Sequence, residues 1–208
     1  ILEKADRVGG TWRENTYPGL SCDVPAHMYT YSFAGNPEYS HRFAKGPEIF
    51  AYFERIAREY GVDKITRFNT EVVDAVYDKG QWRLTTQAGD ILEADIVLCA
   101  TGVLHHPRFP EIEGLDGFAG DLWHTARWNH DVDISGKKVA IIGTGSTATQ
   151  IVATITEQVE KLILFQRSAQ WIYPLFDRTY TEKDKQRLRT TPGLTKKIRD
   201  RYQMAFNQ

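Results

Sequence analysis

The sequence predicts an α/β fold, and three observations carry the prediction. Residues 138–142 are apolar and lead through a glycine-rich turn into an amphipathic helix and a second apolar run at residues 161–165, the order of a βαβ unit. Residues 95–102 form another apolar run that ends in glycine, as a buried parallel strand entering a turn does. Residues 47–60 carry apolar side chains at spacings of three and four, which predicts an amphipathic helix.

The composition is that of an ordinary globular protein. The 208 residues are 41% hydrophobic, and 26 basic against 27 acidic residues give a net charge of −1. This balance gives no indication of nucleic acid or an acidic surface as a partner. No apolar run approaches the roughly 20 residues that span a bilayer, no signal peptide is expected, and two cysteines are too few for a disulfide framework. We therefore expect a cytoplasmic protein with no nucleic-acid and no membrane partner.

Both ends of the chain predict an internal piece of a longer polypeptide. The chain begins with Ile1 rather than Met, and residues 1–3 resemble the last residues of a strand. Its final residues follow a helical stretch without a capping signal.

The first half of the chain predicts a loop, a helix and a small meander. Residues 12–33 are polar and aromatic without a helical period, so we expect a structured loop. Three β-rich runs, at residues 70–78, 81–86 and 91–99, are separated by turn residues and predict the meander. The helix at residues 47–60 should bury Ile49, Phe50, Phe53, Ile56 and Ala57 and end at Gly61.

The second half begins with an irregular linker at residues 103–136, rich in prolines, glycines and aromatics, and continues into the βαβ unit. Its helix should place Ile151, Val152, Ile155 and Val159 on one face. From residue 177 onward nine Lys or Arg stand against four Asp or Glu, on residues that we expect to be helical. This surplus indicates a solvated helical face or a phosphate-facing surface.

The sharpest chemical signal is the turn of the βαβ unit, residues 143–148. In a dinucleotide-binding fold, glycines such as Gly143 and Gly145 permit a tight turn and close approach of the pyrophosphate, and a small residue such as Ala148 lets helix and strand pack. The helix N-terminus then receives the phosphates. A short glycine motif is weak by itself, but its place between an apolar strand and an amphipathic helix favours this interpretation over a structural glycine turn.

The end of the second strand predicts which nucleotide binds. An acidic residue there would hold the ribose hydroxyls of NAD, but this chain has Arg167 and Ser168. A guanidinium makes two-point contacts with phosphate oxygens, so we expect NADP. A solvated surface arginine is the alternative. Glu3, at the end of a strand, is placed as the ribose-binding acid of a first dinucleotide fold.

These residues, in this order, resemble the flavin-dependent Baeyer-Villiger monooxygenases. The resemblance covers residues 1 to about 174, and it rests on Glu3, Gly9-Gly10-Thr11-Trp12, Tyr17-Pro18-Gly19, Asp23, Ala100-Thr101-Gly102 and the second glycine motif. The pattern FxGxxxHxxxW of that family is matched by Phe118, Gly120, His124 and Trp128. Asn129 departs from the Pro or Asp usual in the family, which leaves open a relation to other class B flavin monooxygenases. The flavin glycine loop and the active-site arginine of the family lie outside this chain.

The resemblance implies a role for each matching residue. Glu3 would bind the FAD ribose, Val72 would contact the adenine, and Asp23 and Tyr29 would sit near the flavin and the nicotinamide. His124 and Trp128 would lie in the linker. The flavin side would be lined by Gly10, Thr11 and Trp12, with Ala100, Thr101 and Gly102 passing along the FAD, while NADPH would be held by Gly143, Gly145, Ser146, Thr147, Ala148, Gln150, Arg167 and Ser168.

Several of these residues also have a structural interpretation. Trp12, Tyr29 and Trp128 could be core aromatics, and His124 could be a structural histidine. Asp23 could be a turn residue. His105 and His106 have no metal-ligand spacing with other His or Cys, so we expect no metal.

The resemblance implies two dinucleotide-binding, Rossmann-like domains, an FAD domain interrupted by an NADPH domain, both incomplete here. Residues 1–103 would be part of the FAD domain, 104–136 the linker with the family pattern, and 137–208 part of the NADPH domain. The implied enzyme uses NADPH, FAD and O2 to insert one oxygen atom into a ketone or to oxidise a sulfide, with Asp23 in a catalytic role. An N- or S-oxygenating flavin monooxygenase, an inactive nucleotide-binding fragment and one part of a split gene product are the alternatives.

Overall fold

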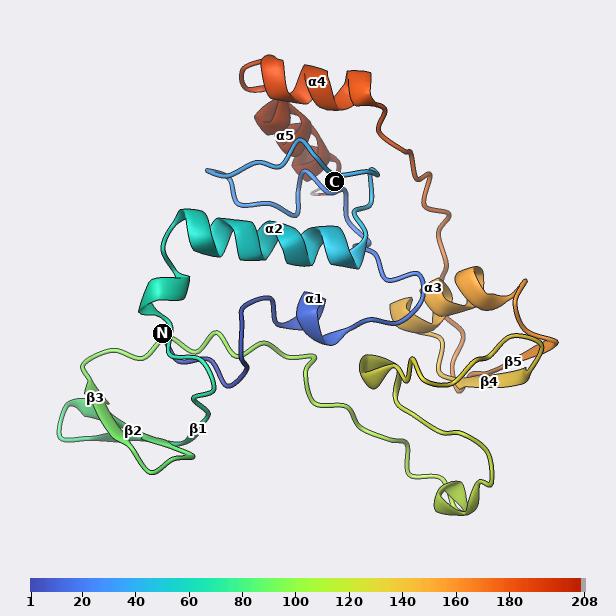
Figure 1. The fold of residues 1–208 in the computed structure, drawn as a ribbon, viewed down its shortest axis with the longest axis horizontal. Helices are drawn as coiled ribbons and strands as arrows, with labels where there is room; N and C mark the ends of the chain where they lie inside the picture. The colour runs from blue at the N-terminus through green and yellow to red at the C-terminus, as the bar shows by residue number, and fades with distance from the viewer. Residues whose placement is uncertain (207–208) are drawn as a thin grey trace. The chain divides into compact units, whose positions relative to one another are not determined.

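The computed structural model describes residues 1–206 (Figure 1). They divide into two compact units, one of residues 1–13 and 50–106 and one of residues 14–49 and the chain from residue 107 on. Two helices, α1 (Thr11–Glu14) and α2 (Gly46–Glu59), contribute residues to both units. The short helix α1 interrupts the stretch for which the sequence predicted only loop, because backbone N–H groups of residues 12 and 13 bond the carbonyls of Gly9 and Gly10.

The first unit contains the predicted meander, β1 (Val72–Asp78), β2 (Gln81–Thr86) and β3 (Ile91–Ala94). Neighbouring strands are antiparallel, and the hairpin between β1 and β2 turns through Lys79 at φ 52° and Gly80 at φ 87°. Positive φ at both central residues matches the right-handed twist of the flanking strands. The prediction of three short strands is confirmed.

The prediction of a buried parallel strand over residues 95–102 is wrong. The chain leaves the sheet at Ala94, and Ile96 and Leu98 are 77% and 88% exposed. A strand is stabilised by backbone hydrogen bonds to a neighbour, and no segment among residues 1–206 pairs with this run. An apolar composition alone therefore does not make it a strand. Gly102, at φ 75°, still provides the turn that the sequence indicated.

The helix predicted at residues 47–60 is α2, and Gly61 at φ 66° ends it as expected. Its buried face includes Tyr52, which was not predicted, and leaves the predicted Phe50 half-buried. Tyr52 and Ile56 are 2% and 4% exposed, whereas Phe53 is half-buried. Tyr52 was overlooked because its hydroxyl counts as polar, although the ring packs as an apolar group.

The second unit contains the βαβ unit as predicted. Strands β4 (Lys138–Ile142) and β5 (Lys161–Phe165) are parallel, in register from Lys138 with Lys161 to Ile142 with Phe165. Helix α3 (Ser146–Ile155) connects them and lies beside the pair in Figure 1. Ile151 and Ile155 are 1% and 0% exposed.

One residue of the predicted helical face falls outside the helix. Val159 lies beyond the last residue of α3, where its backbone N–H and that of Gln158 both bond the carbonyl of Ile155 and turn the chain toward β5. The linker before β4 is irregular apart from two 3-10 turns, η2 (Leu115–Gly117) and η3 (Thr125–Arg127).

The chain after β5 returns to the segment of residues 38–45 before it forms α4 (Glu182–Thr190) and α5 (Leu194–Phe206). The backbone N–H of Tyr180 bonds the carbonyl of Ser40 at 2.7 Å, and that of Arg42 bonds the carbonyl of Arg178 at 2.8 Å. These antiparallel contacts fix the returning chain. Thr181 and Asp184 form a capping box at the start of α4.

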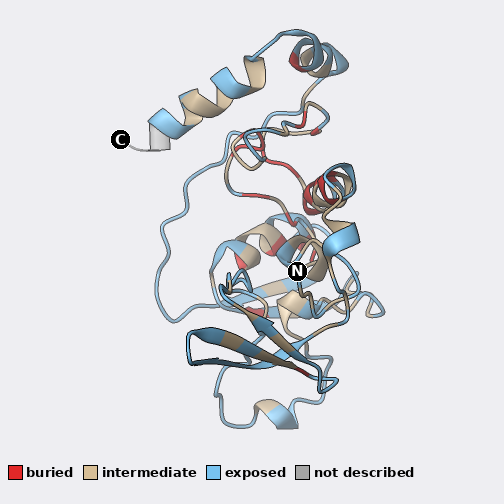
Figure 2. Ribbon diagram, turned by 90° about the vertical axis from the view of Figure 1, so that its left-hand side faces the viewer, coloured by how far each residue is buried: buried red, intermediate tan, exposed pale blue. Residues whose placement is uncertain are grey.

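Buried residues are concentrated in a few elements. Figure 2 shows them on α2, on α3 and on segments of the loop before α2, whereas β1 has none.

Some of the nine basic residues from residue 177 onward form local ion pairs, such as Arg178 with Asp184 and Lys196 with Asp200. These pairs favour the solvated-face interpretation of that stretch.

Candidate functional site

The glycine turn between β4 and α3 is open toward the outside of the unit. Gly143 has φ 108°, a conformation that favours glycine, and its N–H bonds the carbonyl of Phe165 at 2.9 Å. Gly145 is extended and begins α3 without a capping side chain among the described residues. An added Cβ at Gly143 or Gly145 would meet no atom within 4 Å. The turn therefore leaves space in front of the helix N-terminus.

This geometry fits a pyrophosphate. The first N–H groups of an α-helix have no intrahelical partner and carry partial positive charge. At α3 these groups belong to Ser146 and its neighbours, which follow the open glycines directly. The hydroxyl of Thr149 lies one turn on and bonds the carbonyl of Gly145 at 3.2 Å, so that hydroxyl is used within the helix.

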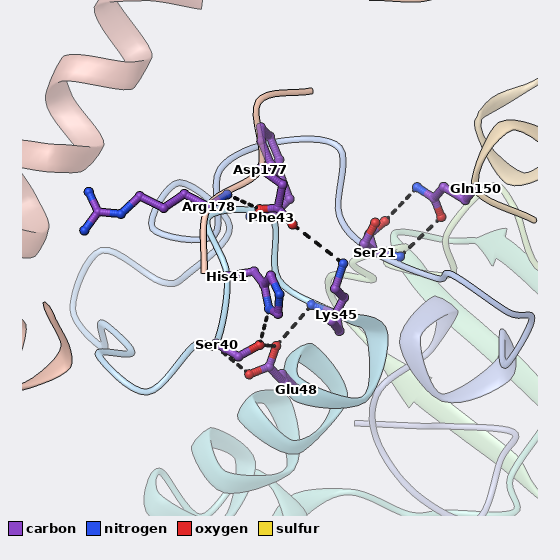
Figure 3. Close-up of polar contacts among 9 residues, drawn as sticks. All are labelled: Ser21, Ser40, His41, Phe43, Lys45, Glu48, Gln150, Asp177 and Arg178. Atoms are coloured by element: carbon purple, nitrogen blue, oxygen red, sulfur yellow. Dashed lines mark hydrogen bonds and ion pairs between the residues drawn. The ribbon is translucent and has the colours of Figure 1, made fainter. Parts of the chain in front are cut away.

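Gln150 does not direct its amide to the glycine turn in this structure. Its Oε1 accepts the hydroxyl of Tyr17 at 3.1 Å and the N–H of Ser21 at 3.2 Å, and its Nε2 donates to the carbonyl of Ser21 at 3.0 Å (Figure 3). A glutamine amide has two donor hydrogens and two acceptor lone pairs. Three of these four positions are therefore filled by the loop before α2.

The loop that meets α3 contains two groups with shifted pKa values. Burial raises the pKa of the Tyr17 hydroxyl, a hydrogen bond with the Thr147 side chain opposes the rise, and the charge of Asp23 adds to it. Burial also raises the pKa of the Cys22 thiol to about 11. Both groups are thus neutral near pH 7. Asp23 itself is exposed at the end of this stretch.

The two residues expected to select the nucleotide follow β5 directly. Arg167 and Ser168 are both exposed, beyond the last residue of the strand at Phe165. The turn at Gly143 and the end of β5 lie at the same edge of the parallel pair, because Ile142 pairs with Phe165. The structure therefore brings the guanidinium-bearing residue and the open glycine turn to one edge of one unit.

The residues expected at the flavin belong in part to the first unit. The Glu3 carboxylate accepts the N–H of Ala5 at 2.9 Å, and its oxygen lies 3.9 Å from the guanidinium of Arg13. Gly9 has φ 116°, and a Cβ there would meet the ring of Phe50 at 2.6 Å. Gly10, at φ 47°, has open space beside it. The absence of a side chain at Gly9 therefore permits close contact with Phe50, and the backbone at Gly10 is accessible to a ligand.

The other expected flavin contacts are dispersed. Thr11 is exposed and Trp12 half-buried on α1, Val72 begins β1 and is 37% exposed, and Tyr29 is half-buried in the loop. Ala100, Thr101 and Gly102 are exposed on the run that forms no strand.

The family pattern in the linker forms local packing. The Nδ1 of His124 accepts the N–H of Ala126 at 3.1 Å and so caps η3, and its ring meets that of Phe109 at 5.8 Å. Trp128 packs edge to face with Trp123 at 5.4 Å. Phe118 and Gly120 are exposed. Asn129, the departure from the family, accepts the N–H of Asp131 at 3.0 Å and so forms a local turn.

The described residues contain neither a cluster of metal ligands nor a helix that could cross a membrane. Over residues 1–206, His, Cys, Asp and Glu side chains do not gather in any group of three or more suited to a metal ion. The rings of His105 and His106 contact each other, with their centroids 4.0 Å apart. In the same residues, each helix is too short or too polar to cross a bilayer.

Sequence reasoning missed the residues that hold the loop before α2. Glu48 accepts the N–H of Ser40 at 2.7 Å and the N–H of Lys45 at 3.2 Å, and Asp177 accepts the N–H of Phe43 at 3.2 Å (Figure 3). Glu48 is the third residue of α2, where a Glu is a capping signal, so it could have been found. Asp177 lies 134 residues from Phe43 in the chain, and no local pattern indicates that contact.

Comparison with known proteins gives the family. The chain matches the flavin-binding monooxygenase-like family over residues 1–191. The chain belongs to this family. It is 46% identical over 198 residues to a Baeyer-Villiger monooxygenase of Streptomyces coelicolor, covering 94% of this chain and 38% of that protein. The resemblance inferred from the sequence is thereby confirmed.

Solved structures give the same likeness for this flavin-binding monooxygenase-like chain. Cyclohexanone monooxygenase from Rhodococcus sp. Phi1 bound to NADP+ superimposes with a TM-score of 0.80 at 35% identity, covering 90% of this chain and 36% of that one. OTEMO in complex with FAD and NADP gives a TM-score of 0.81 at 32% identity, covering 98% and 39%. The predicted α/β class, with two incomplete Rossmann-like domains, is confirmed. The chain spans about two fifths of the curated relatives it matches, 42% and 38% for two of them.

Proposed function

We propose that the full-length product of the gene encoding this chain is an NADPH- and FAD-dependent monooxygenase. It inserts one oxygen atom of O2 into a ketone or oxidises a sulfide; the second oxygen atom leaves as water while NADPH becomes NADP+. The observation that carries the proposal is the open glycine turn at the N-terminus of α3, with Arg167 following the neighbouring strand at the same edge. Family membership and the ligands named for the related structures support it.

The chain's own residues would hold NADPH by charge and by backbone contacts. The pyrophosphate would lie at Gly143 and Gly145 against the N–H groups of Ser146 and Thr147. Arg167 and Ser168 would bind the ribose phosphate, because the guanidinium is a two-point donor to phosphate oxygens. We assign residues 137–208 to this NADPH domain and 104–136 to the linker.

Residues 1–103 would form part of the FAD domain. Glu3 would hold the ribose, and Gly10 to Trp12 would line the flavin beside the open space at Gly10. FAD, when bound, supplies the hydride acceptor and the activation of O2 that protein side chains lack. Asp23 would contribute by fixing a cationic partner near the reacting atoms, where preorganised charge stabilises developing negative charge.

A substrate test separates the proposed activity from its runner-up, an N- or S-oxygenating monooxygenase. The full-length protein is incubated with NADPH, ¹⁸O₂ and either a cyclic ketone or an aryl sulfide, and products are analysed by mass spectrometry. We expect one ¹⁸O atom in the lactone formed from the ketone. Labelled sulfoxide without lactone would narrow the activity to sulfide oxidation, which the runner-up shares, whereas lactone excludes the runner-up. NADPH oxidation without any labelled product would contradict both.

A matched pair of glycines tests the nucleotide site itself. Gly145 and Gly117 both lack the positive φ that forbids a side chain, and both have open space at an added Cβ. Gly145→Ala should weaken NADP+ binding at least about 10-fold, because the methyl group occupies the approach of the pyrophosphate. Gly117→Ala should leave it unchanged. Equal NADP+ affinity of the two variants, by titration calorimetry, would refute the assignment of this turn.

A further inference from the structure

We propose that Gln150 is a positioning residue that holds the loop of residues 17–23 against α3 rather than a ligand of the dinucleotide. The inference deepens the proposed function and rests on it. It concerns what keeps the loop that ends at Asp23 in a fixed position against α3, the helix proposed to receive the pyrophosphate.

The contacts of Gln150 with the loop are specific to a glutamine. Its amide accepts from the hydroxyl of Tyr17 and from the N–H of Ser21, and donates to the carbonyl of Ser21. Bonding both backbone groups of one residue requires a donor and an acceptor side by side, which a side-chain amide provides. Tyr17 is 8% exposed, so these bonds lie in a partly desolvated place where losing a partner is costly.

The loop is also shaped to approach this helix closely. Gly19 has φ 82°, and a Cβ there would overlap the hydroxyl of Thr154 and lie 2.6 Å from the carbonyl oxygen of Gln150. The Thr147 side chain, in the first turn of α3, lies near enough to Tyr17 to lower the pKa of its hydroxyl. The loop thus lies against α3 at Gln150 and at Thr154.

The other side of the loop is fixed by different elements. Backbone bonds join Cys22 N to Ala44 O and Gly46 N to Leu20 O, both at 2.9 Å, so the second half of the loop is paired with the residues at the start of α2. Figure 3 shows Glu48 and Asp177 holding the adjoining segment. Gln150 differs from Glu48 and Asp177 because it holds the loop from α3, the helix of the proposed nucleotide site.

Loss of the Gln150 amide should therefore release the loop from α3 on one side while α2 still holds the other. The N–H and carbonyl of Ser21 would lose their partner, and Asp23, two residues further on, would sample more positions. The glycine turn would keep its shape, since its backbone bonds to β5 do not involve this side chain. A displaced loop affects the rate of the reaction more than the affinity for NADP+.

The test compares Gln150→Met with Gln158→Met in the full-length protein. Methionine matches glutamine in length and lacks the amide, and Gln158 is an exposed residue just after the same helix whose amide bonds only locally, to the carbonyl of Thr154. Hydrogen–deuterium exchange of the peptide containing Ser21 should be roughly 10-fold faster in Gln150→Met. It should be unchanged in Gln158→Met. Equal exchange in the two variants would overturn the inference.

Kinetics separate positioning from ligation and from simple destabilisation. Per bound flavin, the limiting rate of flavin reduction by NADPH should fall roughly 10- to 100-fold in Gln150→Met, with NADP+ affinity within about 3-fold of wild type. Tyr17→Phe should lower the rate too, and the double variant should be no slower than about 2-fold below Gln150→Met, because both act through one contact. Lost NADP+ affinity with an unchanged rate, or losses that multiply, would overturn the inference. A wild-type protein that does not oxidise NADPH would contradict the proposed function instead.

Discussion

Two stretches of this chain share a sequence pattern, an apolar run that leads into glycine. One of them forms a strand and the other does not. Residues 138–143 form β4 and its turn, and Ile141 is 8% exposed. Residues 95–102 form no strand, and Leu98 is 88% exposed. The difference is that β4 has a parallel partner, β5, which the chain reaches through a single helix. Of these two runs, the one that has a hydrogen-bonded neighbour and a connecting helix among the described residues is the one that forms a strand.

The comparison also explains why one nucleotide site is compact and the other dispersed. The proposed NADPH residues lie on one strand-helix-strand unit between Gly143 and Ser168. The proposed FAD residues come from residues 3–29, from β1 and from the run that forms no strand. We expect variants in the two regions to differ accordingly in their effects on stability and binding.

The largest contrast should be in stability. Ile155 is fully buried on α3, and Ile155→Ala should lower the free energy of unfolding by about 2 to 5 kcal/mol through lost burial and the cavity left behind. In this 208-residue chain, Leu98→Ala should change it by less than about 0.5 kcal/mol, because the side chain is already in water. Urea unfolding of both variants measures the difference. Equal losses would show that residues 95–102 are packed in solution.

A second contrast is in pH dependence, and it concerns a buried histidine of the packed region. His27 is 1% exposed, and neither ring nitrogen has a hydrogen-bond partner among the described residues. Burial, and then the nearby charge of Arg199 on α5, lower its pKa from 6.5 to about 4. Below pH 6.5 His27 is protonated in the unfolded chain, whereas in the folded chain it stays neutral until the pH approaches 4. Stability is therefore complete above pH 6.5 and is lost as the pH falls toward 4.

At pH 5 this loss should amount to about 2 kcal/mol relative to neutral pH. His27→Phe should remove most of it, as seen by thermal unfolding at pH 7.5 and pH 5. The exposed His106→Phe should leave the wild-type pH dependence in place. A His27→Phe variant that loses as much stability at pH 5 as the wild type would contradict the prediction.

The third expected effect is on nucleotide choice. If Arg167 binds the ribose phosphate, Arg167→Ala in the full-length protein removes a charge-assisted hydrogen bond of about 1.5 to 3 kcal/mol. NADPH affinity should then fall roughly 10- to 150-fold, with little change for NADH. Arg187→Ala, an exposed arginine on α4, is the control. Similar losses for both nucleotides would make Arg167 a structural residue.

The elements that could be predicted from the sequence are those whose stabilising contacts come from residues nearby in the chain. The β4–α3–β5 unit, the meander and α2 were all indicated by periodicity and turn residues, and the glycine turn has the open geometry that its composition implied. The state of residues 95–102 was not predictable, because it depends on a pairing partner. The Gln150 contacts join residues 129 positions apart, and a motif that places Gln150 on a nucleotide gives no signal of the loop it contacts.

The most direct test of the account is anaerobic stopped-flow mixing of the flavin-loaded full-length protein with NADPH and, separately, with NADH, following the absorbance of the oxidised flavin. The account predicts rapid bleaching with NADPH. It predicts bleaching at least about 10-fold slower with NADH at equal concentration, the discrimination expected of one guanidinium–phosphate contact. Equal rates with the two nucleotides, or no bleaching with NADPH, would contradict the assignment of the β4–α3–β5 unit as the NADPH site of a flavin monooxygenase.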